Sequence, residues 1–446
     1  MHGTLRAETT GLALAYPGDK AQNAAGSICL LTCIMHPTPL VSSEIRNAQT
    51  AFPEKRCHDG RNAMVDMQAT PIEHRHQGKI VAQYRRFANL SQRDLAELMH
   101  VSTHTVQRME QEAVIKELDR RRFLVALLGI PAAYLGLDHE QQEIEKTIFI
   151  FNDDPMSFLE DMLATRWKTH LMGGPLHAAH SLDRLVNEVI TFAQQVQGQA
   201  WQKRAQVQLC MAYQLQGSIA SDMMRYKQAL EAYRNAFAVA HELHDVELMA
   251  AVRVREGIIF MRREKPLQAI MHLTNALELV NGQGFPRLRG NILAVLSEAY
   301  AKAQRPQESS HTIGLAERAL EQTESVRERS YRMCSAASVT AHKGIDALLL
   351  HDYDRALRLI EKSLKTYNPT LTPGRARLLA RKAEAHYGLH SLSECIDTAE
   401  QALTLANSVG ASNTFVRVKH LHAALAQSRW SREPGVLRLG ALLAGN

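Results

Sequence analysis

Residues 91–110, SQRDLAELMHVSTHTVQRME, predict two short helices separated by a tight turn. Ser91 is a favourable N-cap residue, and the apolar residues that follow it recur at the spacing of one helix face. A second N-cap residue, Ser102, follows the turn, and Val106 and Met109 are the apolar residues of the second helix. The outward side of this second helix is rich in hydrogen-bonding groups and carries no acidic residue. The stretch therefore predicts two packed helices with a polar outer surface.

Helical patterns flank this pair on both sides. Residues 78–88 predict a preceding helix, and residues 118–128 and 131–137 predict two closing helices. Pro131 suits the first turn of a helix, where its missing N–H is not needed. The sequence therefore predicts a small five-helix domain over residues 71–138.

The composition is that of a globular protein. The chain has 446 residues, of which 45% are hydrophobic and 22% charged, and this length suffices for two or three domains with a core in each. The formal net charge of +6 is compatible with a polyanionic partner without demonstrating one. Because the six cysteines are spread through a long chain, we expect no disulfide framework.

Neither a secretory signal nor a membrane span is expected from the sequence. The first twenty residues have no basic start followed by an apolar core. The longest uncharged apolar stretch, 123–137, is too short to cross a bilayer. We therefore expect a cytoplasmic protein with no membrane association.

Residues 1–70 have no sustained hydrophobic period and contain scattered Pro, Gly, Asn and Thr. We expect this segment to be disordered or poorly ordered, and Met64 and Met67 raise the alternative that it is an extension translated from an early start codon. It contains residue types that can ligate zinc: Cys29, Cys33, His36, Cys57 and His58. Their spacing is not that of a standard zinc site, so a structureless tail without metal is the prediction, with zinc as the alternative.

Residues 139–154 are predicted to be a linker, and residues 155–446 show almost only helical periodicity. Residues 155–446 contain a repeated pattern of four positions. A small residue at position i is followed by a second small residue at i+12, an apolar residue at i+16 and a third small residue at i+19. The copies are Gly217-Ala229-Tyr233-Ala236, Gly257-Ala269-Leu273-Ala276, Ser297-Ser309-Ile313-Ala316, Gly344-Ala356-Ile360-Ser363 and Ala383-Cys395-Ala399-Ala402. They are offset by 40, 40, 47 and 39 residues.

Small residues at a fixed interval let two antiparallel helices cross closely and stack on the next pair. The pattern resembles the tetratricopeptide repeat, with a period longer than the usual value of about 34 residues. Ordinary solenoid packing explains these small residues without any ligand. We expect one more degenerate helix pair over residues 155–200 and a capping helix over residues 413–430. The predicted fold class is therefore all-α, a helix-turn-helix domain followed by an α-solenoid.

The stretch 91–110 also resembles the helix-turn-helix of XRE/Cro-type regulators. The matching residues are Gln92, Ala96, Val101, Ser102, Val106 and Glu110. The family pattern favours Arg85 as the ion-pair partner of Glu110. It also favours Gly in the turn, where this chain has His100, and His is among the residues that tolerate the positive φ needed there. Two helices joined in this way can place the second in the major groove of DNA.

The outward residues of the second helix are the candidates for base contacts. Arg108 can bind guanine bidentately and Gln107 suits adenine, whereas threonine and histidine side chains offer methyl or hydrogen-bonding groups. The resemblance places base contacts on Thr103, His104 and Arg108. The predicted DNA-binding residues are Gln92, Arg93, Ser102, Thr103, His104, Thr105, Gln107, Arg108 and Arg86, the phosphate candidates among them being Gln92, Arg93 and Arg86. Each is alternatively a solvated surface residue, and Arg120-Arg121-Arg122 is either a solvated face or a phosphate clamp.

A helix-turn-helix joined to such repeats resembles bacterial quorum-sensing regulators whose repeat domain binds a short peptide. The resemblance implies a homodimer on a palindromic operator in double-stranded DNA, and a ligand on the concave face. The predicted ligand-binding residues are Gln214, Ser218, Asn291, Glu298, Arg377 and Glu384. No phosphate loop, nucleotide-binding glycine motif or hydrolase motif occurs, so neither an enzyme nor a cofactor is predicted. The alternative function is a protein-interaction scaffold in which the small domain only docks or dimerises.

Overall fold

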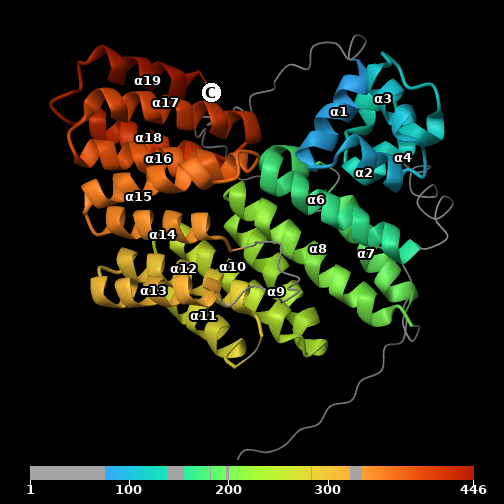
Figure 1. Cartoon of the computed structure of the whole chain (residues 1–446), viewed down its shortest axis with the longest axis horizontal. Coiled ribbons are helices and arrows are strands. Elements are labelled where there is room, and N and C mark those ends of the chain that lie inside the picture. The colour runs from blue at the N-terminus through green and yellow to red at the C-terminus, as the bar shows by residue number, and fades with distance from the viewer. Residues whose placement is uncertain are drawn as a thin grey trace, which may run out of the picture. The chain divides into compact units, whose positions relative to one another are not determined.

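Figure 1 shows a computed structural model of the chain, which describes residues 76–137, 155–180, 182–196, 200–282, 284–321 and 334–445. Within these ranges the chain forms helices and turns, with no β-strand. No helix in them combines the length and apolar character needed to cross a membrane. The predicted N-terminal extension and the predicted linker over residues 139–154 lie outside the described residues.

The N-terminal helical unit, residues 76–137, contains four α-helices and one 3-10 helix. They are α1 (Gln77–Phe87), α2 (Gln92–Leu98), α3 (Thr103–Gln111), α4 (Leu118–Leu128) and η2 (Ala132–Leu135). Val81, Leu95, Val106 and Leu124 are fully buried in one core shared by these helices. The prediction of an α-helix over residues 131–137 was wrong, because Gly136, in the left-handed region at φ 69°, ends a single 3-10 turn.

The turn between α2 and α3 has the predicted geometry. Ser91 and Asp94 form a reciprocal capping box at the start of α2, and the Ser102 hydroxyl accepts a hydrogen bond from the Thr105 N–H at the start of α3. His100 has a φ of 52°, so the prediction of a positive φ at this position is confirmed. The left-handed residue lets the N–H of Val101 turn back and donate to the Ala96 carbonyl at 2.9 Å.

The repeat region, residues 155–445, consists of antiparallel helix pairs that stack in order along the chain (Figure 1). The first two helices, α6 (Pro155–Ala178) and α7 (Leu182–Gln195), each pack against α8. The pairs that follow are α8 (Gln202–Asp222) with α9 (Tyr226–Glu242), α10 (Val246–Arg262) with α11 (Pro266–Leu279), α12 (Pro286–Lys302) with α13 (Pro306–Glu321), α14 (Ala336–Leu349) with α15 (Tyr353–Thr366), α16 (Thr372–Gly388) with α17 (Leu392–Val409), and α18 (Ser412–Ala426) with α19 (Pro434–Ala444). The capping helix predicted over residues 413–430 is shorter, ending at Ala426, and it is followed by α19, which was not predicted.

The repeated small residues lie where helices cross. All twenty positions of the five sequence copies are buried. A Cβ atom added at Gly217 would collide with the Tyr233 ring, and one added at Gly257 would come within 2.8 Å of Leu273. The first and third positions of the pattern therefore face each other across a pair, which confirms the predicted close crossing.

The turn within each pair repeats with the same offsets as the sequence pattern. Each of these five turns contains a non-glycine residue at positive φ: Met224, Glu264, Gln304, His351 and His390. The residue after it donates its N–H to a carbonyl at the end of the first helix, as in the 2.8 Å bond from Arg225 to Ala220. The repeats therefore share a turn as well as a crossing, although no glycine stands in these turns.

Helix α6 contacts α1 of the N-terminal helical unit and also α16 and α17 of the repeat region. Its kink, where Gly174 has a φ of 78° before Pro175, packs against α17 so closely that a Cβ on Gly174 would meet Val409. On the N-terminal side of the molecule, the His177 ring of α6 stacks on Phe87 of α1, with ring centroids 4.1 Å apart. The N-terminal helical unit therefore contacts α6 through α1, and α6 also contacts α17.

Candidate functional site

The outer side of α3 exposes three of the predicted base-contact residues. His104, Gln107 and Arg108 are exposed, whereas Thr103 and Thr105 are half-buried. The side chain of Arg108 is 64% exposed and lies 3.5 Å from the Glu112 carboxylate, an ion pair too exposed to hold it tightly. Arg108 is therefore available to an external partner.

Two predicted DNA-binding side chains are used within the helix instead. The Ser102 hydroxyl caps α3 by accepting from the Thr105 N–H at 3.2 Å, and its oxygen lies 2.9 Å from the Thr105 hydroxyl. Both hydroxyl groups therefore contribute to starting α3, and DNA binding by Ser102 and Thr105 stays a prediction.

An ion pair joins α3 to α1 on the buried side of α3. Arg85 is buried, and its guanidinium donates to both carboxylate oxygens of Glu110, with the Nη2–Oε2 bond at 3.1 Å. Its Nη1 also donates to the Leu90 carbonyl at 2.7 Å. Burial raises the pKa of Glu110, but hydrogen bonds from Arg85 and Gln92 outweigh it and lower that pKa. The predicted Arg85–Glu110 pair is confirmed.

Gln92 contacts this ion pair. Its amide nitrogen donates to Oε2 of Glu110 at 2.8 Å, so this hydrogen is directed at a carboxylate rather than at a DNA phosphate. The predicted phosphate contact by Gln92, through its side chain and the local backbone N–H groups, stays a prediction. Arg86 and Arg93 remain exposed phosphate candidates.

The three consecutive arginines of α4 each have a neighbour in their own unit. Arg120 pairs with Glu117 at 2.7 Å, Arg121 donates to the Leu135 carbonyl at 2.9 Å, and Arg122 lies 3.4 Å from Asp119. These contacts favour a structural role for the run over a phosphate clamp.

The predicted ligand residues lie on the first helices of the pairs. Gln214 and Ser218 of α8 are fully buried. Arg255 of α10 donates to the side-chain amide oxygen of Gln214 at 2.9 Å and to the Ser218 hydroxyl at 3.3 Å. The Arg255 guanidinium also lies over the Trp167 ring, 4.8 Å from its centroid. The prediction that Gln214 and Ser218 lie open to a ligand is corrected, since both join α8 to α10. Sequence reasoning missed Arg255, although a charge two positions before the repeat glycine was a usable signal.

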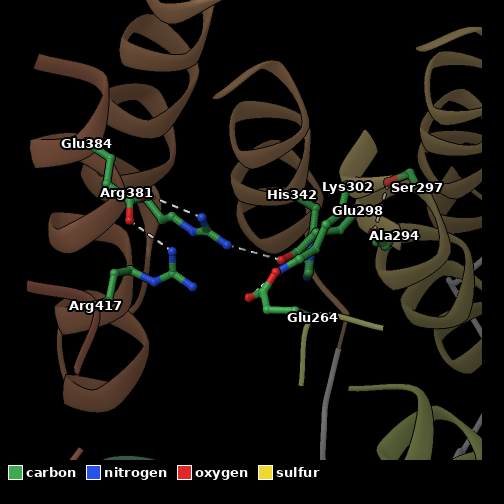
Figure 2. A network of polar contacts seen from close by, with 9 residues as sticks. All are labelled: Glu264, Ala294, Ser297, Glu298, Lys302, His342, Arg381, Glu384 and Arg417. Carbon is green, nitrogen blue, oxygen red and sulfur yellow. Dashed lines mark hydrogen bonds and ion pairs between the residues drawn. The ribbon is translucent and has the colours of Figure 1, made fainter. Parts of the chain in front are cut away.

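A second polar network runs across α12, α14, α16 and α18 (Figure 2). Glu298 lies 2.9 Å from Nδ1 of His342 and 3.5 Å from Arg381, which pairs at 3.1 Å with Glu384. Arg417 binds the other oxygen of Glu384 at 2.9 Å. Two of the predicted ligand residues, Glu298 and Glu384, are thus joined through Arg381.

The charges in this network keep its acids ionised. Burial raises the pKa of Glu298, but the hydrogen bond and charge of His342 and the charges of Arg381 and Arg377 lower it further than burial raises it. Burial likewise raises the pKa of Glu384, and Arg381 and Arg417 lower it more. The predicted residue Arg377 is exposed one turn before Arg381, and Asn291 is half-buried two turns before Glu298.

Asp346 of α14 is the exception among these acids. It is 4% exposed, and neither carboxylate oxygen has a hydrogen-bond partner of good geometry among the described residues. Burial and the nearby charge of Glu298 raise its pKa well above the ordinary value, while the hydroxyls of Ser297 and Ser309 lower it less. The Asp346 carboxyl, next to the two serines that replace Gly and Ala in the third repeat copy, therefore binds a proton more readily than an ordinary aspartate does.

Asp346→Asn is expected to raise the free energy of unfolding at pH 8, because asparagine stays neutral without binding a proton, whereas each unit by which the site raises the pKa of Asp346 costs the wild type about 1.4 kcal/mol there. Because the folded state keeps a proton that the unfolded state loses above its own pKa of 3.8, the wild type loses stability as pH rises from that value. The advantage of the variant should thus shrink towards pH 5. Urea unfolding at pH 8 and pH 5 measures the difference in unfolding free energy between the variant and the wild type, with Asp354→Asn at an exposed position as the control. An equal difference at both pH values would contradict the raised pKa of Asp346.

The described residues contain no group of three or more His, Cys, Asp or Glu side chains placed to hold a metal ion. The zinc alternative for residues 29–58 lies outside them.

No protein-family model matches the chain, and no curated protein matches it in sequence. Solved structures that match include a Rap protein complexed with competence and sporulation factor, at 12% identity and a TM-score of 0.49, over 73% of this chain and 86% of that one. Another is Bacillus thuringiensis PlcR in complex with the peptide PapR7 and DNA, at 15% identity and a TM-score of 0.34, over 79% of this chain and 99% of that one. A third is a signal transduction ATPase with a tetratricopeptide repeat sensor from Pyrococcus horikoshii, at 11% identity and a TM-score of 0.39, over 83% and 63%. At these identities and TM-scores, none assigns the chain to a family.

Proposed function

We propose that this chain is a sequence-specific DNA-binding transcriptional regulator whose repeat region senses a peptide or protein partner. It binds a palindromic operator as a homodimer in the cytoplasm, and it has no catalytic role. The observation that carries the proposal is the surface of α3. This helix exposes His104, Gln107 and Arg108 in one row, at the three- and four-residue spacing of a helix face.

The buried side of α3, opposite the exposed row, also supports a DNA-binding role. Val106 and Met109 are buried on its opposite side, and the Arg85–Glu110 pair ties it to α1. A recognition element needs such support, because base contacts require side chains held on a rigid element. The nine-residue helix is long enough to present one row of side chains to a major groove.

The contact between α1 and α6 supports a sensing role for the repeats. Since Phe87 stacks on His177, a movement of α6 in response to a bound partner reaches the N-terminal helical unit directly. Among the predicted ligand residues on the first helices of the pairs, the exposed Arg377 and the half-buried Asn291 provide polar groups suited to a peptide backbone.

Arg108→Ala is expected to weaken binding to a selected operator roughly tenfold or more, because a bidentate arginine–guanine contact contributes about 1–3 kcal/mol of discrimination. The operator is first selected from random-sequence duplex DNA with the full chain. Mobility shifts at fixed salt then compare it with a scrambled duplex. Lys116→Ala removes an exposed charge from the same unit outside α3 and serves as the control.

Arg93→Ala gives a contrasting readout in the same assay. As a phosphate contact, it should weaken binding to both duplexes equally and reduce the salt slope by about 1. If Arg108→Ala prefers the selected operator over the scrambled duplex as strongly as the wild type does, Arg108 does not contact bases. A chain that selects no DNA sequence and is not retained on heparin would instead favour the scaffold function.

A further inference from the structure

The outer face of α15, the orange helix of that label in Figure 1, carries a row of positively charged side chains. Arg355, Arg358, Lys362 and Lys365 are all exposed, and they follow one another at intervals of three, four and three residues. This spacing places them on one side of the helix, with about 5–6 Å between successive Cβ atoms. We refer to these four residues as the α15 row.

The acids near the α15 row are mostly held elsewhere. The Asp352 carboxylate caps the helix by accepting from the Arg355 N–H at 3.3 Å, and Glu361 lies 2.8 Å from the Lys382 ammonium of α16. Asp354 is exposed in the first turn, so it weakens the positive charge only at that end of the row. Within the described part of the chain, no ion pair engages a side chain of the α15 row.

The second helices of other pairs carry a different charge pattern on their outer faces. On α9 the exposed residues Lys227, Glu231 and Arg234 alternate in sign, and on α17 the exposed charges include Glu394 and Asp397. A row of one sign is also unfavourable for its own helix, because like charges three and four residues apart repel each other. A negatively charged partner that lies along α15 removes this repulsion.

The surroundings of the row favour phosphates over other negatively charged partners. No large apolar residue of α15 is exposed, whereas protein interfaces and membrane-bound helices need an apolar centre or face. Phosphates are bound by charge alone. The row spans about 15 Å at a rise of about 1.5 Å per residue, and about four nucleotides of one DNA strand span the same length.

We propose that the α15 row binds the phosphate backbone of double-stranded DNA without reading its sequence. It adds a contact surface in the repeat region to the one proposed for α3 in the N-terminal helical unit. The choice of DNA over RNA rests on the function proposed above, whereas the phosphate contact itself does not depend on base recognition by α3.

Fluorescence anisotropy of a labelled random-sequence duplex, titrated with the full chain over a range of salt concentrations, tests the row. The double variant Arg358→Gln with Lys362→Gln should bind roughly tenfold more weakly at low salt, with a salt slope smaller by about 2, since each lost phosphate contact lowers it by about 0.9. The matched control is Lys227→Gln with Arg234→Gln on α9, which removes the same charge from a face that also carries Glu231. It should change the affinity and the slope much less.

Thermal unfolding of the same proteins separates a lost contact from a folding defect. Removal of two like charges from an exposed helix face should leave the unfolding midpoint unchanged or slightly raised. Lys362→Glu should weaken duplex binding more than Lys362→Gln does, because it places a repelling charge beside the phosphates. A duplex affinity that follows the charge at this position, at an undiminished midpoint, supports the contact.

Three results would overturn the proposal or part of it. Equal affinities and salt slopes in the α15 and α9 double variants would remove the α15 row as a phosphate contact, and operator selection through α3 would still stand. Binding of random duplex through the row by a chain that selects no operator would support the row and refute the regulator. If duplex RNA or polyglutamate of equal charge displaces the labelled DNA more effectively than unlabelled DNA does, the partner is RNA or an acidic protein, and the assignment to DNA is wrong.

Discussion

Arg85→Ala is expected to destabilise the N-terminal helical unit by about 3–5 kcal/mol, the usual cost of removing one partner from a buried ion pair. The side chain of Glu110 is 8% exposed, and without Arg85 its carboxylate keeps only the Gln92 amide as a donor. The Leu90 carbonyl loses its side-chain donor in the same variant. Because Glu110 lies at the end of α3, operator binding should weaken along with stability.

Urea unfolding followed by circular dichroism measures this effect, and the double variant Arg85→Met with Glu110→Leu provides the control. An apolar pair of similar volume removes the unpaired charge, so it should restore most of the lost stability. In the wild type, the lowered pKa of Glu110 gives stability that is present above the unfolded value of 4.5 and is lost as pH falls below it. The difference between Arg85→Ala and the wild type should therefore narrow in acid. A double variant that is no more stable than Arg85→Ala would show that the loss does not come from the unpaired Glu110 carboxylate.

Gly217→Ala is expected to lower the free energy of unfolding by about 1–3 kcal/mol, the cost of overpacking a filled core. The three atoms nearest to a Cβ at this position all belong to the Tyr233 ring, which is 2% exposed and cannot move aside without disturbing α9. The gain in helix propensity from alanine is smaller than this clash.

Gly314→Ala is the matched control, because nothing lies within 4 Å of a Cβ at that helical position. Here only helix propensity changes, so stability should rise by about 0.5–1 kcal/mol. Thermal and urea unfolding of the two variants compare them directly. A stabilising Gly217→Ala would show that the α8–α9 crossing is looser than the structure has it.

Features encoded by local patterns were predictable from the sequence. Capping residues and apolar spacing indicated α2 and α3, and a tight turn between them called for a left-handed residue at His100. The offsets of the repeat copies likewise predicted the stacked pairs, since close helix crossings need small residues at one fixed position. Where such signals were weak the predictions were wrong, as at residues 131–137, where two glycines at positive φ leave room for one 3-10 turn.

The partners of the candidate site residues were decided only by the tertiary structure. Periodicity shows that Gln214 lies on a helix face towards its neighbours, but not that Arg255, 41 residues later, donates to it. It shows that Glu298 is polar among apolar residues, but not that His342 and Arg381 meet it from two further repeats. The contact of Asn413 with Ser221, 192 residues apart, depends on the summed rotation of every pair between them. Side-chain spacing determines which face of a helix is buried, whereas small angles accumulated over successive packed pairs determine which distant residue that face meets.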